Sequence, residues 1–163
     1  MTAHFNKKPR AYGFTLVEIL VVIGLLGVLT TAGLTSYSRT QKNSRDAKRK
    51  ADLEQLRVGL EQYRADNSAY PNVTAGSTET NLKPSMTAPV PYFSATSFPK
   101  DPQNRQNFFY YYQRNPGGGG VNTYRLCTYV ENIVAGDPAC PNAAANCKTV
   151  GGNVACNYGL TQP

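Results

Sequence analysis

The chain has 163 residues, a length that fits one domain of ordinary size and argues against two. Its 17 basic and 10 acidic residues give a net charge of +7, and 17% of its residues are charged, below the roughly 25% of a typical soluble domain. The 11 tyrosines and 6 phenylalanines argue against wholesale disorder, which requires high charge and few aromatics. The single histidine, His4, lies in a polar N-terminal stretch, which argues against a histidine-based enzyme.

An apolar run, residues 14–34, carries a single charge, Glu18. As a helix it would be roughly 30 Å long, enough to cross the hydrocarbon core of a bilayer. The polar leader before it, residues 1–13, is basic, which predicts an N-terminus on the cytoplasmic side. A secretory signal peptide fits poorly, because the run is longer than about 15 residues and no small-x-small site closes it. An ordinary signal anchor would leave Glu18 without a role.

Glu18 is the informative residue of this run. A carboxylate inside an apolar span costs about 2–3 kcal/mol and usually has a partner. No basic side chain lies one turn away from Glu18 in its own helix, so the partner must come from another molecule. Cleavage of the chain before Phe14 would free an α-amino group in the same apolar layer. We therefore predict that the amine of Phe14 in one copy pairs with Glu18 of a neighbouring copy and sets the register of a polymer.

The segment Gly13-Phe14-Thr15-Leu16-Val17-Glu18 and the apolar run after it resemble the class III signal of type IV pilins and type II secretion pseudopilins. In that family a membrane-embedded aspartyl prepilin peptidase cleaves after the glycine and methylates the new N-terminal phenylalanine. The resemblance implies cleavage between Gly13 and Phe14, an N-methylated Phe14, and subunit assembly through Phe14 and Glu18. It also implies an α+β type IV pilin fold, with a long N-terminal helix packed on a small antiparallel β-sheet.

Residues 35–66 predict the amphipathic half of the same helix, which we expect to run from about Phe14 to Asp66. Four apolar residues recur there at helical spacing: Leu53, Leu56, Leu60 and Tyr63. Such a stripe predicts packing against a sheet.

Basic residues cluster early in this half, at Arg39, Lys42, Arg45, Lys48, Arg49 and Lys50. One interpretation is binding to nucleic acid or to anionic lipid, in which each cation makes a salt-sensitive contact. The interpretation we favour is a solvated helix face that Asp46 and Asp52 balance in part. Removing the leader lowers the net charge from +7 to +4, which weakens the case for DNA binding.

The remaining residues, 67–163, are expected to form a globular head. Residues 67–105 hold many prolines and predict an irregular loop with little regular structure. Within them, Phe98–Asn104 resembles the turn before the sheet in major pseudopilins of the G type, although Asp101 also suits an ordinary turn. In residues 106–163 we predict three strands: Asn107–Gln113, Asn122–Glu131 and Val154–Thr161. A flexible turn, Gly117–Gly120, separates the first two.

All four cysteines, Cys127, Cys140, Cys147 and Cys156, lie in this last part, which is predicted to be exported and disulfide-bonded. A hairpin turning at Gly151-Gly152 would place Cys147 opposite Cys156, in a non-hydrogen-bonded pair. Leu126 and Val130 are expected to face the helix, which puts Cys127 on the other face and leaves Cys140 as its partner. The nested pairing, Cys127 with Cys156 and Cys140 with Cys147, stays open.

No catalytic constellation, metal site or cofactor is predicted. Zinc is disfavoured because no Cys-x-x-Cys pair exists. The resemblance to G-type pseudopilins implies calcium bound by acidic residues of a C-terminal loop, but here that loop has only Glu131 and Asp137.

The leading hypothesis is a non-enzymatic subunit of a type IV pilus that supports adhesion, motility or DNA uptake. The alternative is the major pseudopilin of a type II secretion system, and a third hypothesis is a membrane-anchored binding protein that never polymerises. The implied partners are other copies in a helical filament, the prepilin peptidase, and an inner-membrane assembly platform with its ATPase. We expect a single-pass inner-membrane protein before assembly, and an extracellular pilus or a periplasmic pseudopilus afterwards.

Overall fold

The computed structural model describes residues 13–104, 107–115, 122–140, 145–148 and 152–161. The leader up to Tyr12 and the predicted turn Gly117–Gly120 lie outside the described residues. The chain divides into two compact units, Met1–Thr40 and Gln41–Pro163.

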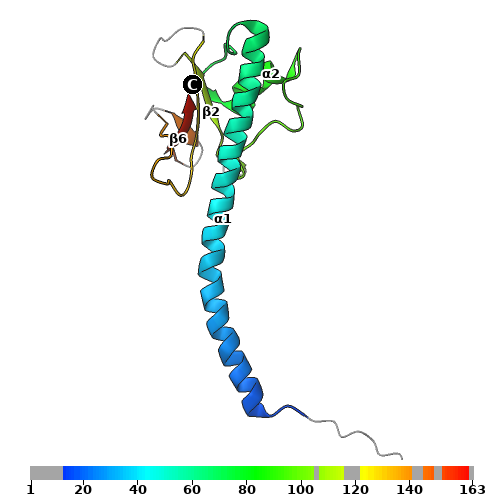
Figure 1. The fold of residues 1–163 in the computed structure, drawn as a ribbon, viewed down its shortest axis with the longest axis vertical. Coiled ribbons are helices and arrows are strands. Elements are labelled where there is room, and N and C mark those ends of the chain that lie inside the picture. The colour runs from blue at the N-terminus through cyan, green and yellow to red at the C-terminus, as the bar shows by residue number, and fades with distance from the viewer. Residues whose placement is uncertain (1–12, 105–106, 116–121, 141–144, 149–151, 162–163) are drawn as a thin grey trace, which may run out of the picture. The chain divides into compact units, whose positions relative to one another are not determined.

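Helix α1 extends over 52 residues, Leu16–Asn67, and takes part in both units (Figure 1). It begins two residues later than the apolar pattern indicated, because Thr15 caps it. The Thr15 hydroxyl accepts the backbone N–H of Glu18 at 3.2 Å, which satisfies one of the free donors of the first turn. The helix ends where Ser68 adopts a left-handed conformation, with φ of 59°, and donates its N–H to the carbonyl of Arg64.

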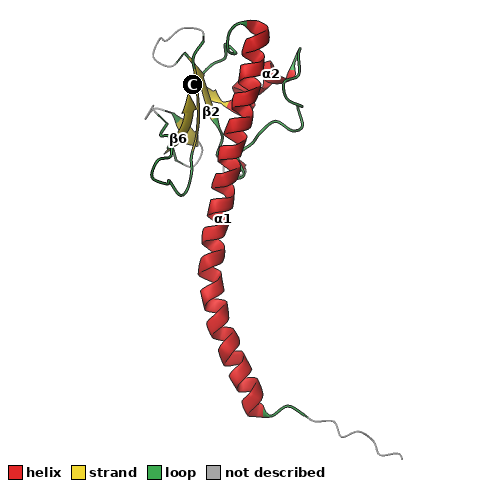
Figure 2. Cartoon of the chain, viewed as in Figure 1, coloured by secondary structure: helices red, strands yellow, loops and turns green. Residues whose placement is uncertain are grey.

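A four-stranded antiparallel sheet in the order β1-β2-β3-β6 packs on the second half of α1 (Figure 2). Its strands are β1 (Gly76–Ser77), β2 (Tyr111–Arg114), β3 (Tyr124–Thr128) and β6 (Tyr158–Thr161). A separate two-stranded sheet consists of β4 (Asn146–Lys148) and β5 (Val154–Ala155). The long apolar helix with a small antiparallel sheet is the α+β architecture that the resemblance predicts.

The strands are shorter than predicted, because two segments change partners partway along. In the first, Phe109 donates its N–H to the carbonyl of Cys147 and Phe108 bridges Lys148, so only the end of the predicted strand joins β3. The last predicted strand divides into β5 and β6 at Asn157, whose side chain bonds both the N–H and the carbonyl of Val130. The predicted strand Asn122–Glu131 contracts to β3.

The segment predicted to be an irregular loop contains regular structure. After β1, a π-helical turn η1 (Thr78–Leu82) leads into the short helix α2 (Lys83–Thr87). The Ser77 side chain accepts the N–H of Thr80 at the start of η1, and Pro84 occupies the first turn of α2, where its missing N–H costs no hydrogen bond. Pro84 therefore begins a helix inside the segment whose prolines predicted irregular structure.

The main hydrophobic core lies between α1 and the sheet. The predicted stripe supplies Leu53, Leu56 and Leu60, all buried, while Tyr63 is half-buried against them. The other buried members are Tyr70, Leu82, Met86, Phe93, Phe98, Tyr110, Tyr112, Tyr124, Leu126, Val130, Tyr158 and Leu160. Leu126 and Val130 face this core, as predicted.

On the opposite face of the sheet, a second small core forms around two disulfides, Cys127–Cys140 and Cys147–Cys156. These are the pairs that the predicted hairpin favoured over the nested alternative. The hairpin register differs from the expected one, however. Asn146 pairs with Ala155 and Lys148 with Val154, so Cys147 sits at an irregularity of the ladder instead of directly opposite Cys156. Gly151, half of the predicted turn, lies outside the described residues.

Candidate processing and assembly site

Gly13 and Phe14 precede α1 as exposed, non-helical backbone, and the Phe14 side chain is 79% exposed. A Cβ built on Gly13 would have no neighbouring atom within 4 Å. The structure of the chain itself therefore does not require glycine at this position. A requirement for glycine would have to come from a protein that binds this segment.

Glu18 lies in the first turn of α1, where a carboxylate interacts favourably with the positive end of the helix dipole. The sequence Thr15-Leu16-Val17-Glu18 fits a capping box, a signal that could have placed the helix start from sequence. Among the described residues no ion pair includes Glu18, and the nearest described basic residue, Arg39, is 21 positions along the chain. A cation for this carboxylate must come from outside the described part of the chain.

The helix around Glu18 contains a stretch long and apolar enough to cross a membrane, and none of that stretch is buried in the structure. Its hydroxyl groups are satisfied locally. Thr30 donates to the carbonyl of Leu26 at 2.6 Å and Thr31 to the carbonyl of Gly27 at 2.7 Å. The carboxylate of Glu18 is thus the one charged side chain in an otherwise satisfied apolar surface between Phe14 and Thr31.

In the head, Arg49 is fully buried and holds three segments together. Its guanidinium donates to Asp46 on α1 and to Asp101 in the turn before β2, each at 2.9 Å. It also reaches Gln103 at 2.7 Å and Glu131, after β3, at 3.3 Å. Burial works to lower the pKa of Arg49, but the hydrogen bonds and charges of Asp101 and Asp46 outweigh it and raise that pKa.

Two further ion pairs fix the loop that follows β3. Arg45 makes a bidentate contact with Glu131, at 2.6 and 2.8 Å, and this contact lowers the pKa of Glu131. Lys50 donates to both oxygens of Asp137, at 2.6 and 2.7 Å, and lowers the pKa of that carboxyl group. Asp46 accepts the backbone N–H groups of Glu131 and Asn132. The loop is therefore tied to α1 at both ends.

The solvated-face interpretation of the basic cluster is wrong for Arg49 and only partly right for the others. Arg45, Arg49 and Lys50 bond carboxylates of the head, while Arg39, Lys42 and Lys48 are exposed. Asp101, which lies in the turn that resembles G-type pseudopilins and for which an ordinary turn role was the alternative, is the buried partner of Arg49.

A signal for this arrangement was present in the sequence. Asp46 and Arg49 continue the spacing of Leu53, Leu56 and Leu60 toward the N-terminus, in steps of three, four, three and four residues. They lie on the buried face of the helix, not on its solvated face.

Across the described ranges, no group of three or more His, Cys, Asp or Glu side chains is arranged to hold a metal ion. The four cysteines that a zinc site would need are all used in disulfides. The two acidic residues of the C-terminal loop, Glu131 and Asp137, bond to arginine and lysine side chains of α1.

Comparison with known proteins agrees with this geometry. Residues 36–138 match the family of the type II secretion system (T2SS) protein G, and residues 8–34 match the prokaryotic N-terminal methylation motif. The chain is 35% identical to type II secretion system core protein G of Pectobacterium carotovorum over 92 residues. That alignment covers 56% of this chain and 56% of that protein. Over 100 residues it is 30% identical to the core protein G of Vibrio cholerae, covering 60% of this chain and 68% of that protein.

A weaker similarity connects the chain to a pilin. It is 26% identical over 68 residues to the type IV major pilin protein PilA of Myxococcus xanthus, which covers 42% of this chain and 30% of that protein. No solved structure matches the chain. The comparisons thus favour the pseudopilin hypothesis over the pilus hypothesis, and the chain belongs to the type II secretion system protein G family.

Proposed function

We propose that this protein is the major pseudopilin of a type II secretion system, a structural subunit without enzymatic activity whose polymerisation drives protein export. The observation that carries the proposal is the combination of the methylation motif with a protein G head: residues 8–34 match the first and residues 36–138 the second. The apolar span with its single carboxylate supports a subunit that is anchored in the inner membrane before it polymerises.

In this proposal the prepilin peptidase cleaves between Gly13 and Phe14. Gly13 and Phe14 are exposed and non-helical, which is consistent with a bond that a protease can reach before the helix begins at Leu16. Cleavage gives Phe14 a charged α-amine, and methylation leaves that amine basic. The methyl group shields part of the charge without removing it.

Polymerisation would then pair the amine of Phe14 in one copy with Glu18 of the next. In an apolar layer an unpaired carboxylate or amine costs several kcal/mol, so the pair selects one register among the many that apolar helices alone would allow. The hydroxyls of Thr30 and Thr31 already donate to carbonyls of their own helix. They therefore do not compete with Glu18, which is the group that would specify the contact between copies.

The test is deletion of the coding sequence in the native host, followed by assay of exported enzymes and of surface filaments. We expect exported enzymes to accumulate in the periplasm and long surface filaments to be unaffected. Loss of surface filaments or twitching, with export intact, would instead support the pilus hypothesis. Unchanged export and unchanged filaments would overturn both.

A further inference from the structure

The loop after β3, residues 131–137, is the segment in which the resemblance to G-type pseudopilins implies a calcium ion. Calcium takes about six to eight oxygen ligands, carboxylates among them. The loop has two acidic side chains, Glu131 and Asp137. Whether they suit a metal ion depends on what their four carboxylate oxygens already contact.

All four of these oxygens accept hydrogen bonds from cations of α1. Arg45 binds both oxygens of Glu131, at 2.6 and 2.8 Å, and Arg49 reaches one of them at 3.3 Å. The ammonium group of Lys50 lies 2.6 and 2.7 Å from the two oxygens of Asp137. A divalent ion at either carboxylate would have to replace charge-assisted hydrogen bonds that are already made. The acidic residues of this loop therefore do not fit a calcium site.

Both ends of the loop have further anchors. At its start, the carboxylate of Asp46 accepts the backbone N–H groups of Glu131 and Asn132, at 2.9 and 2.8 Å. Beyond its end, the disulfide Cys127–Cys140 joins the chain back to β3 across a sequence separation of 13. These contacts already hold both ends of the loop in place, which is the structural effect that a bound ion would have.

The neighbouring strand β6 leaves room for this disulfide at Gly159. A Cβ there would lie 2.9 Å from the Sγ of Cys127 and 2.9 Å from the Cα of Cys140, closer than side chains pack. The N–H of Gly159 also donates to the carbonyl of Pro138 at 3.0 Å, which fixes the chain just after Asp137. The disulfide is therefore part of the packing of the sheet.

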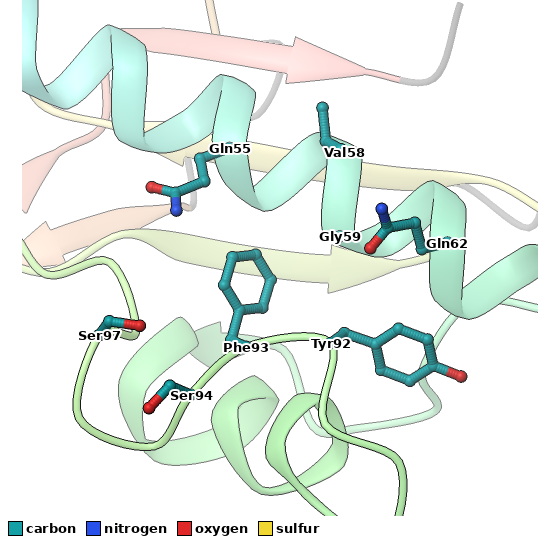
Figure 3. Close-up of a pocket in the computed structure, with 8 residues that line it drawn as sticks. All are labelled: Gln55, Val58, Gly59, Gln62, Tyr92, Phe93, Ser94 and Ser97. Atoms are coloured by element: carbon teal, nitrogen blue, oxygen red, sulfur yellow. The ribbon is translucent and has the colours of Figure 1, made fainter.

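Two hollows elsewhere in the head offer calcium no better set of ligands. One, of about 290 Å³, is lined by uncharged residues, among them Gln55, Gln62 and Phe93 (Figure 3). Another, of about 350 Å³, is lined by one acidic residue, Glu79, whose carboxylate lies 2.6 Å from the ammonium group of Lys100.

We propose that Arg45 and Lys50, together with the disulfide Cys127–Cys140, take the place of calcium in this chain. The head binds no calcium, and its stability depends on these ion pairs and on this disulfide. The proposal concerns the folded head and applies equally to a subunit of a pseudopilus and to a subunit of a pilus. It can therefore fail while the proposed function stands, and the reverse.

The first test measures the response to calcium in the unaltered protein. The full-length chain in detergent is melted in millimolar calcium chloride and in EGTA, and calcium chloride is titrated into it in a calorimeter. A ligand at a hundred times its Kd raises the melting temperature of a domain of this size by about 10 °C. We expect equal melting temperatures and no heat of binding. A higher melting temperature in calcium, or a saturable heat, would overturn the proposal.

The second test removes the cation at Asp137. Lys50→Met should speed the hydrogen exchange of backbone amides in residues 131–137, measured on the full-length chain in EGTA. Lys48→Met is the matched control, because Lys48 is exposed on the same helix and is not one of the cations that bond the loop. It should exchange like the wild type. If Lys50→Met also exchanges like the wild type, Lys50 does not hold the loop and the proposal is wrong.

The third test compares the two disulfides by the same measurement. Removing the first with Cys127→Ala and Cys140→Ala should speed exchange in residues 131–137. Removing the second with Cys147→Ala and Cys156→Ala should leave that exchange unchanged, because the segment that this disulfide closes does not include the loop. Equal exchange of the loop in the two double variants would show that Cys127–Cys140 has no special part in holding it.

Discussion

Arg49 Nε donates to Asp101 Oδ2 at 2.9 Å, and the two side chains, 52 positions apart, are almost completely buried. This bond joins α1 to the turn before the sheet, and the same guanidinium reaches Asp46 and Glu131. One arginine therefore connects the helix that anchors the chain to two loops of the head.

Arg49→Met should destabilise the head by about 3–5 kcal/mol, because it leaves buried carboxylates at Asp46 and Asp101 without their cation. Arg57→Met is the matched control. Its contact with Glu54 is a 3.4 Å pair between exposed side chains and should be worth at most about 1 kcal/mol. Chemical unfolding of the full chain in detergent, followed by tyrosine circular dichroism, measures both. Equal losses for the two variants would contradict the central role of Arg49.

The contact between Arg45 and Glu131 should make the stability of the head depend on pH in a defined direction. Arg45 lowers the pKa of Glu131 below its ordinary value of 4.5. The ionised form is therefore favoured in the folded state, and its contribution is fully present above about pH 4.5 and disappears as the pH falls through the lowered pKa.

We expect Glu131→Gln to lower the melting temperature by a constant amount above pH 5, and the difference from wild type to shrink only in more acidic solution. Melting curves of the two chains over a pH series measure this difference. A difference that grows as the pH falls would show that the sign is wrong.

Gly59→Ala should destabilise the head by about 1–3 kcal/mol, because the new methyl group collides with the Phe93 ring, which packs edge-on against Phe98. The collision must outweigh a gain in helix propensity of about 1 kcal/mol. In a Phe93→Ala background the same substitution should therefore become stabilising. A double-mutant cycle of unfolding free energies tests this coupling, and additive effects would refute it.

Removing one disulfide with Cys147→Ala and Cys156→Ala should cost about 2–3 kcal/mol, as expected for a bond that closes a short loop. Alkylation of the exported wild-type protein without reduction should find no free thiol. Peptide mapping of the same unreduced sample should join Cys127 to Cys140. A peptide joining Cys127 to Cys156 would mean that the nested pairing forms instead.

How much of this structure was accessible from sequence depends on whether a contact is local. Periodicities and turns a few residues long predicted the apolar span and the buried stripe of Leu53, Leu56 and Leu60. A short turn likewise favoured the pairing of Cys147 with Cys156. Arg49 could not be assigned in the same way, because its partners Asp101 and Glu131 are 52 and 82 positions away.

The aromatic run before β2 illustrates the same limit. Its residues have uniform strand propensity, but Phe108 pairs with Lys148 while Tyr111 pairs with Cys127. Propensity alone cannot indicate that the segment changes sheets. At the processing and assembly site, by contrast, the sequence is more informative than the structure of a single chain. The partners that we propose for the motif from Gly13 to Glu18 are other molecules, so the structure of a single chain shows few contacts there.

The central claim is that Phe14 of one copy pairs with Glu18 of the next. The most direct test uses cells in which the only gene for this chain carries Glu18→Ala, and it measures the fraction of exported enzyme that reaches the medium. The Glu18 side chain is exposed, and the bond from its backbone N–H to Thr15 is one that alanine can also make. The account predicts a chain processed before Phe14, present in the membrane at near-normal levels, and an export defect equal to that of the deletion strain. Normal export with the Glu18→Ala chain would contradict it.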